Sequence, residues 1–173
     1  SLKIGSFRAA SNVTGILSDA EGITRLLHSH GALAVWDYAA GGPYIDIDMN
    51  PGGDPALAKD AVVLSPHKFI GGPGTPGLLV VRRELLTNRV PDIVGGGTVA
   101  YVSPTEHTYL TDPEHREEGG TPAIIESIRA GLVFDLKRTV GPDVIRAHEE
   151  DLVRRAVTAW SANPAIRVLG NVE

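Results

Sequence analysis

The chain has 173 residues, which suits one domain of ordinary size. Its 16 basic and 21 acidic residues give a formal net charge of −5, which argues against nucleic acid as a partner. The absence of cysteine excludes disulfides and thiolate metal sites within these residues. No apolar run has the length of a membrane span and no secretion signal opens the chain, so we expect a cytoplasmic protein without membrane contacts.

The first forty residues predict two strands separated by a helix. Residues 3–10 form the first predicted strand, and a loop follows at 11–15. Ser18 and Glu21 have the spacing of a capping box, and Gly31 is placed to end the helix. Residues 32–36 are an unbroken apolar run that ends at Asp37. Such runs, separated by an amphipathic helix, indicate an α/β fold with a mainly parallel sheet covered on both faces.

The stretch from Ala61 to Arg83 organises the prediction for the whole chain. Its two apolar runs, 61–64 and 78–81, are short and rich in β-branched residues, so each is predicted to be a buried strand. A rigid loop rich in glycine and proline joins them, and Lys68 stands where the first strand ends. Partial burial there would favour the neutral, nucleophilic amine of a Schiff-base lysine. The alternative is an ordinary solvated lysine at a strand end.

Several polar side chains follow the ends of the predicted parallel strands. Asn12 follows the first strand, Asp37 the second, and Ser65, His67 and Lys68 the third. Ligands of parallel sheets collect beyond the carboxyl ends of the strands. This coincidence predicts a ligand site at one edge of the sheet.

Two other motifs fit known sites less well. Asp46, Asp48 and Asn50 alternate like the start of a calcium-binding loop, but the sixth loop position is Pro51 and the twelfth is Leu57. The glycine-rich loop at 71–77 lacks the Gly-Lys-Ser/Thr ending of a phosphate-binding P-loop, which argues against a nucleotide site.

The second half of the chain predicts a loop region followed by two helices. Residues 84–90 suggest a short helix, and 98–120 show little periodicity, as expected for a functional or disordered loop. Thr121 and Pro122 predict the cap and first turn of a helix that ends near Gly141. A second helix is predicted over 142–161, with His148 packed on its inner face. A strand is predicted at 165–169.

Taken in order, five motifs resemble the class V aminotransferase family of pyridoxal-phosphate (PLP) enzymes, which have fold type I and include cysteine desulfurases and selenocysteine lyases. The motifs are S-N-V-T-G, W-D-Y-A-A, S-P-H-K with its Gly/Pro loop, G-G-G and R-E-E-G-G-T-P. The resemblance covers the whole chain but only the central part of such an enzyme. It implies that residues 1–162 belong to the PLP-binding large domain and that 163–173 begin a truncated C-terminal small domain.

The resemblance also implies roles for the predicted site residues. Lys68 is expected to form the Schiff base with PLP and to move the proton at the substrate α-carbon, and Asp37 to hold the pyridine nitrogen protonated. Ser65 and His67 correspond to phosphate ligands, and Asn12 to a contact near the ring oxygen or the substrate carboxylate. Thr121 corresponds to a residue that reaches the phosphate of the neighbouring subunit, so a homodimer is expected.

One departure from the family pattern leaves a second hypothesis open. The family commonly places a polar residue at position 40, and this chain has Ala40, whose methyl group donates no hydrogen bond. A non-catalytic scaffold or partner-binding domain of the same fold is therefore the alternative to an enzyme that acts on an amino acid. The sequence leaves open transamination, sulfur or selenium removal, and racemisation. In the family, the opposite wall of the PLP site comes from a part of the enzyme that would precede residue 1. We therefore expect residues 1–173 alone to bind PLP weakly.

Overall fold

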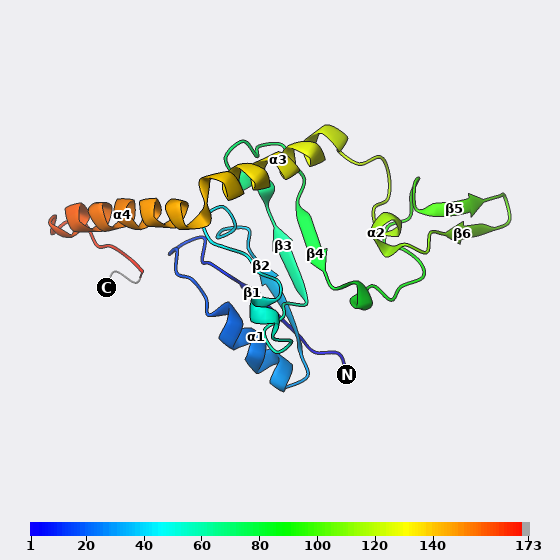
Figure 1. Ribbon diagram of the computed structural model, residues 1–173, viewed down its shortest axis with the longest axis horizontal. Helices are drawn as coiled ribbons and strands as arrows, with labels where there is room; N and C mark the ends of the chain where they lie inside the picture. The colour runs from blue at the N-terminus through cyan, green and yellow to red at the C-terminus, as the bar shows by residue number, and fades with distance from the viewer. Residues whose placement is uncertain (171–173) are drawn as a thin grey trace.

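A four-stranded sheet forms the centre of the computed structural model, which describes residues 1–170. Strands β1 (Ile4–Arg8), β2 (Leu33–Asp37) and β3 (Ala61–Leu64) run parallel, and β4 (Leu78–Val81) is antiparallel to β3. The strand order is β1-β2-β3-β4, as Figure 1 shows. The predicted α/β fold with a mainly parallel sheet is confirmed.

One face of the sheet carries the core. Alternate residues Ala34, Trp36 and Val62 point to this face and are almost fully buried. Helix α1 (Ala20–Ser29) covers them, and the indole Nε1 of Trp36 donates to Thr24 Oγ1 at 2.9 Å. Helix α1 packs directly against Gly5 of β1. A Cβ at this position would lie 2.5 Å from a methyl carbon of Leu27 on the helix. The absence of a side chain at position 5 therefore sets how near α1 approaches the sheet.

The opposite face of the sheet is open in the part of the chain that the structure describes. Ile4 and Leu79 point to this face and are 56% and 61% exposed. The predictions of cover on both faces and of a buried fourth strand are therefore wrong for residues 1–170. The reason is that α1 and the Phe134 region of helix α3 (Ile124–Val140) both pack on the Trp36 face, where Phe134 lines one cavity with Val62.

Helix α1 begins one residue later than the predicted capping box implies. Asp19 is the N-cap, and its Oδ1 accepts from Gly22 N at 2.9 Å. The Ser18 hydroxyl instead donates to the Arg8 carbonyl at 2.7 Å and ties the helix entry to the end of β1. The helix ends before Gly31, whose φ of +65° fits the predicted stop.

The region predicted as a long loop contains regular structure. A hairpin of β5 (Val99–Val102) and β6 (His107–Tyr109) precedes the short helix α2 (Pro113–Arg116). Figure 1 shows this hairpin projecting from one end of the molecule. The predicted helix over 84–90 is reduced to one 3₁₀ turn at Arg83–Leu85. The hairpin escaped prediction because its strands are short and mostly exposed, so they show no apolar alternation.

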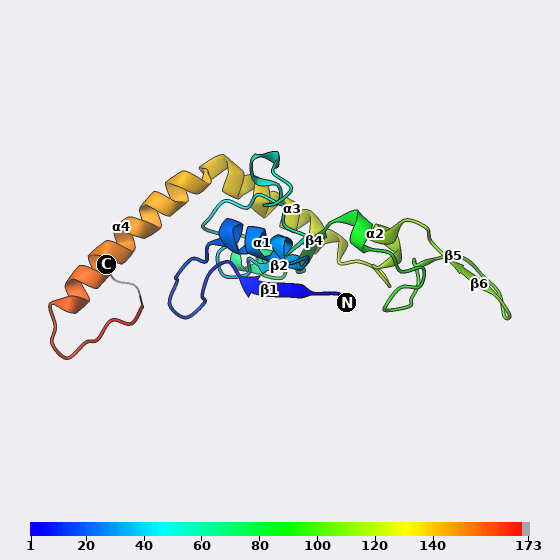
Figure 2. The ribbon, with the colours of Figure 1, turned by 90° about the horizontal axis from the view of Figure 1, so that it is seen from below.

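Helices α3 and α4 (Pro142–Ser161) meet at Gly141, which has φ +94°. Both helices were predicted with nearly these bounds. The N-cap of α3 is Ala123, without a side-chain hydrogen bond, so the prediction that Thr121 caps this helix is wrong. Figure 2 shows α4 leaving the sheet at an angle to α3.

The exposed side chains of α4 contradict the predicted inner face of that helix. Val144 is 62% exposed and His148 is exposed, so the packed histidine is a wrong prediction within residues 1–170. The cause is that α4 extends beyond the sheet and none of its residues is buried.

Residues 165–169 form no strand, and 171–173 of the predicted small-domain segment lie outside the described residues. The domain boundary near Asn163 stays a prediction. No helix within residues 1–170 has the length and apolar character needed to cross a membrane.

Candidate active site

The three parallel strands bring their carboxyl ends to one edge of the sheet. Their register pairs Arg8 with Asp37 and Asp37 with Val63. Beyond the strands, Ala9 N donates to the Asp37 carbonyl and Tyr38 N donates to the Val63 carbonyl, both at 2.9 Å. The segments that carry Asn12, Asp37 and Ser65 therefore leave the sheet side by side, as the sequence predicted.

Asp37 is the last residue of β2 and is half-buried. Its Oδ1 accepts from Ala39 N at 2.7 Å, so the carboxylate closes a turn of its own backbone. Among residues 1–170 this is the hydrogen bond that its side chain makes, which leaves Oδ2 for a ligand. Asp37 thus caps the turn that follows β2 with one carboxylate oxygen, and its other oxygen stays available at the edge of the sheet.

A single turn of 3₁₀ helix (Pro66–Lys68) carries the other candidate residues. Lys68 N donates to the Ser65 carbonyl at 3.0 Å, and the buried ring of Pro66 anchors the turn. Gly72 closes over it so tightly that a Cβ would lie 1.9 Å from the Pro66 carbonyl oxygen. This contact explains why the glycine-rich loop must lack a side chain at position 72, and it fixes the backbone that presents Ser65, His67 and Lys68.

Lys68 and His67 are exposed in the structure. The predicted partial burial of Lys68 is therefore wrong for the described residues, since the sheet edge above it is uncovered. Lys68 lies on the rim of an apolar cavity of about 310 Å³, whose walls include Phe69, Val133 and Val144. Most of the residues that line this cavity belong to α3 and α4, and Asp37, Ser65 and His67 are not among them.

The desolvated lysines are two others, which the sequence did not single out. Lys59 is 3% exposed and its Nζ donates to the Asp48 carbonyl at 2.5 Å. Lys137 of α3 is half-buried and its Nζ donates to the Gly42 carbonyl at 2.8 Å. Burial lowers the pKa of both ammonium groups. Neither position carries a sequence signal, because the carbonyl groups that hold them are brought close only by the fold.

Asn12 and Thr121 are the more peripheral of the predicted site residues. Asn12 is exposed in the turn after β1, and its Oδ1 accepts from the guanidinium of Arg8. Thr121 is exposed and precedes α3 by three residues. No hydrogen bond within residues 1–170 joins Thr121 to Asp37 or to the Lys68 turn, so the structure does not bring it into this group.

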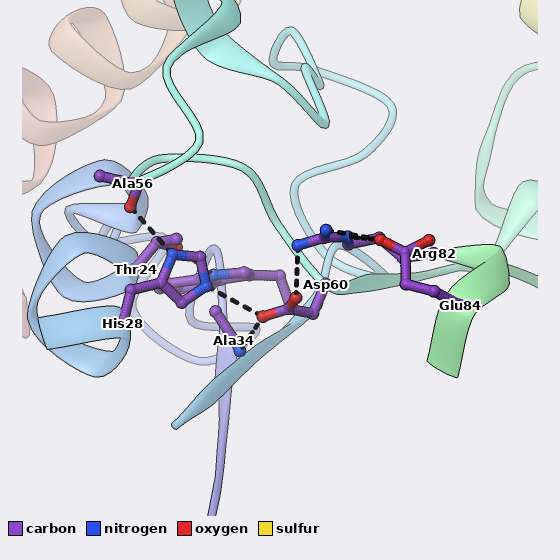
Figure 3. Close-up of polar contacts among 8 residues, drawn as sticks. Thr24, His28, Ala34, Ala56, Asp60, Arg82 and Glu84 are labelled. Carbon is purple, nitrogen blue, oxygen red and sulfur yellow. Dashed lines mark hydrogen bonds and ion pairs between the residues drawn. The ribbon is translucent and has the colours of Figure 1, made fainter. Parts of the chain in front are cut away.

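The opposite edge of the sheet holds a buried ionic network that the sequence did not predict (Figure 3). Asp60 is 1% exposed and its Oδ2 accepts from His28 Nε2 at 2.9 Å and from Ala34 N at 2.7 Å. Its Oδ1 accepts from the Arg82 guanidinium at 3.2 Å. These three hydrogen bonds converge on the residue before β3, away from the candidate site. The network joins α1, β2 and the end of β4, and its role is structural.

The carboxyl edge carries one amine, one imidazole, one hydroxyl and one carboxylate, from Lys68, His67, Ser65 and Asp37. Within residues 1–170 no group of three or more His, Asp or Glu side chains is arranged to hold a metal ion. The edge instead suits an organic group that has an anionic end for His67 and Ser65 and a basic centre for Asp37.

Comparisons with known proteins find relatives over the whole chain. The sequence profile of the family Aminotransferase class-V matches residues 1–173. A probable cysteine desulfurase of Streptomyces coelicolor is 33% identical over 168 residues, which are 97% of this chain and 38% of that protein. The chain therefore spans about two-fifths of the length of this relative.

Solved structures of cysteine desulfurases also superpose on almost the whole chain. The apo structure of a cysteine desulfurase from Thermococcus onnurineus superposes with a TM-score of 0.84 and 27% identity, over 99% of this chain and 41% of that one. A cysteine desulfurase from Escherichia coli superposes at 0.76 with 27% identity, over 95% and 39%. A more distant enzyme, 18% identical, was solved with glycine covalently linked to its PLP cofactor and shares the fold at 0.70, over 92% and 40%.

Proposed function

Because the chain belongs to the class V aminotransferase family, we propose that its protein is a PLP-dependent enzyme that acts on an amino acid through Lys68. The observation that carries the proposal is the arrangement at the carboxyl edge. Lys68, with Ser65 and His67 in the same turn, stands beside the strand end that carries Asp37. Ligands of parallel sheets bind at such edges.

The residues at this edge fit PLP. Asp37 keeps one carboxylate oxygen for a protonated pyridine nitrogen while the other holds the Ala39 amide. Ser65 and His67 can donate hydrogen bonds to a phosphate. Gly72, which has no side chain, packs directly on the Pro66 carbonyl group of the same turn. Lys68 would hold the cofactor through its Nζ. When bound, PLP supplies an electron sink for the bond-breaking step at the substrate α-carbon.

The chain's own residues then have defined tasks. The Nζ of Lys68 takes up and returns the proton at the α-carbon as general base and acid. The carboxylate of Asp37 keeps the pyridine nitrogen positively charged, because a nearby negative charge favours the protonated form. Asn12, after β1, would contact the ring oxygen or the substrate carboxylate.

Removal of sulfur from cysteine is the reaction that we propose. It is supported by the cysteine desulfurases of Streptomyces, Thermococcus and Escherichia, each of which matches at least 95% of this chain. The absence of cysteine in the chain does not count against it, because a sulfur-accepting thiol can come from elsewhere in the protein. We further propose a homodimer in which Thr121 reaches the phosphate bound by the neighbouring subunit.

A non-catalytic scaffold of the same fold is the second candidate, and Ala40 is the observation that favours it. Ala40 lies in the turn after Asp37 and offers only a methyl group. The two candidates differ in a direct assay of the protein that contains this chain. With PLP, L-cysteine and an added thiol reductant, the enzyme releases alanine, the reductant converts the removed sulfur to sulfide, and Lys68→Ala abolishes both products. A protein that binds PLP through Lys68 but releases no alanine is the scaffold, and one that binds no PLP contradicts both the cofactor and the reaction.

A further inference from the structure

Lys137, on α3, reaches two turns that are far from it in the sequence. Its Nζ donates to the carbonyl oxygens of Gly42, at 2.8 Å, and Ile45. The same Nζ lies 5.8 Å from the centroid of the Phe69 ring. Gly42 and Ile45 belong to the segment after Asp37, and Phe69 directly follows Lys68. One ammonium group therefore contacts both chain segments that leave the candidate active edge.

The first of these segments is tied closely to Asp37. Gly42 N donates to the Tyr38 carbonyl at 2.7 Å, and Tyr38 N donates to the Val63 carbonyl of β3. Gly42 is buried, so its carbonyl group needs a hydrogen-bond donor within the protein. Lys137 supplies that donor. The position of the 38–45 segment, and with it the turn closed by the Asp37 carboxylate, depends on this contact.

The second segment is tied through an aromatic ring. Phe69 is 4% exposed and packs edge-on against Phe134, one helical turn before Lys137, with ring centroids 4.9 Å apart. Its far edge lies so near the first segment that a Cβ on Gly42 would approach within 3.3 Å of the ring. Ring, glycine and ammonium thus form one packed unit behind Lys68.

The surroundings of Lys137 select a charged ammonium group rather than a neutral amine. Two carbonyl oxygens accept hydrogen bonds from it, and the negative face of an aromatic ring lies within the ~6 Å range of a cation–π contact. Burial lowers its pKa, while the nearby Asp46 acts in the opposite direction. An amine whose hydrogens are held by the backbone in this way is suited to fixing structure and not to nucleophilic attack.

We propose that Lys137 is a positioning residue, which holds the Asp37 turn and the Lys68 turn in a fixed relation to one another and so pre-forms the PLP site. The proposal rests on the proposed function of Lys68 and Asp37. Groups that bind one rigid cofactor from two separate turns must be held in register, because a displacement of about 1 Å can cost up to about a hundredfold in rate. Lys137 contacts both turns at once.

The test compares Lys137→Met with Lys59→Met in the protein that contains this chain. Both changes replace a desolvated, carbonyl-bound ammonium with an apolar side chain of similar length, but Lys59 holds the Asp48 carbonyl. Hydrogen exchange of the cofactor-free protein is measured for peptides covering residues 38–46 and 65–72, and PLP affinity is measured by absorbance. We expect Lys137→Met to speed exchange in both peptides and to weaken PLP binding about tenfold. Lys59→Met should do neither, and Lys137→Arg should restore part of the affinity.

Equal effects of Lys137→Met and Lys59→Met on both measurements would overturn the proposal and show that each lysine is merely structural. If Lys137→Met does not fold, Phe69→Leu removes the ring but keeps an apolar side chain, and unchanged exchange at 65–72 together with unchanged PLP affinity overturns the proposal equally. Failure of the proposed function is separate, because it appears in the parent protein as PLP binding that Lys68→Ala leaves unaffected.

Discussion

Asp37 shows how one side chain serves both the fold and the proposed chemistry. Its Oδ1 holds the Ala39 amide, so part of the carboxylate is committed to the turn at the end of β2. The remaining oxygen makes no hydrogen bond within residues 1–170 and belongs to the strand end beside the segment that carries Lys68. An asparagine can reproduce the first task, because its carbonyl oxygen accepts the same hydrogen bond, but not the negative charge needed for the second.

We therefore expect Asp37→Asn to fold normally and to lose turnover by about a hundredfold or more, the scale on which a lost electrostatic contact acts in an active site. Asp48→Asn is the matched control, because Asp48 Oδ1 accepts from Asn50 N at 2.8 Å in a similar turn away from the edge. Turnover and thermal melting are measured for both variants. Undiminished turnover in Asp37→Asn would reduce Asp37 to a cap.

His115 and Asp112 form an exposed pair with a defined pH dependence. The Asp112 carboxylate accepts from His115 Nδ1 at 2.6 Å and raises the pKa of that imidazole, and the same bond, with help from Arg83, lowers the pKa of Asp112. Because the folded-state pKa of His115 is raised, the pair contributes fully below the unfolded value of about 6.5 and is lost as pH rises through the folded value.

We expect an NMR titration of the His115 ring to give a pKa above 6.5 in the parent protein and one close to 6.5 in Asp112→Asn. Asparagine can still accept the helix-capping bond from His115 N, so α2 is kept while the charge is removed. A titration midpoint that does not fall in the variant would show that the pair does not persist in solution.

At the level of elements, the Asp60 network explains how α1 and the sheet are joined at the edge opposite the site. One buried carboxylate accepts from an imidazole, a backbone amide and a guanidinium, and so links α1, β2 and the residue after β4. His28 is further held through Nδ1 by the Ala56 carbonyl at 3.1 Å. The network holds the starts of β2 and β3 in place. The candidate ligand-binding groups lie at the opposite ends of these strands.

Asp60→Asn should lower the free energy of unfolding by about 2–3 kcal/mol. The amide removes the negative charge and turns an NH₂ group toward a hydrogen-bond donor. Because Arg82 is partly exposed, its interaction with Asp60 contributes less to the loss of stability than a fully buried ion pair would. Asp135→Asn breaks an exposed pair with Arg138 and should cost less than about 0.5 kcal/mol. Urea denaturation measures both. A loss in Asp60→Asn as small as that of the control would mean that the network contributes little.

The sequence predicted the four strands of the central sheet, α1, α3 and α4, because their apolar periodicity and their glycine stops are local signals. It placed Asn12, Asp37 and the Lys68 turn at one edge because parallel strands end together. It failed for the 98–120 hairpin, whose strands bury little, and for the inner face of α4, which has no neighbour among residues 1–170. Lys137 and Asp60 could not be found from the sequence, since their partners are more than 20 residues away along the chain.

At the level of the whole molecule, the apolar surfaces that remain exposed have a regular arrangement. Every fourth residue from the start of α3 into α4 is apolar and exposed: Ile124, Ile128, Leu132, Leu136, Val140 and Val144. The five of these residues that belong to α3 form a ridge of the kind by which one helix packs into the grooves of another, and Val144 follows the break at Gly141. Together with the open face of the sheet, it leaves a large apolar surface exposed on a chain that spans about two-fifths of the length of its relatives.

The central claim is that this chain holds PLP through Lys68 at the carboxyl edge of its sheet. Borohydride reduction of the PLP-loaded protein, followed by peptide mapping, tests it most directly, because reduction makes the attachment permanent. The chain contains two other lysines that burial makes less basic, Lys59 and Lys137, so the outcome is a choice among named positions. We predict the pyridoxyl label on Lys68. A label on Lys59 or Lys137 in its place would contradict the account.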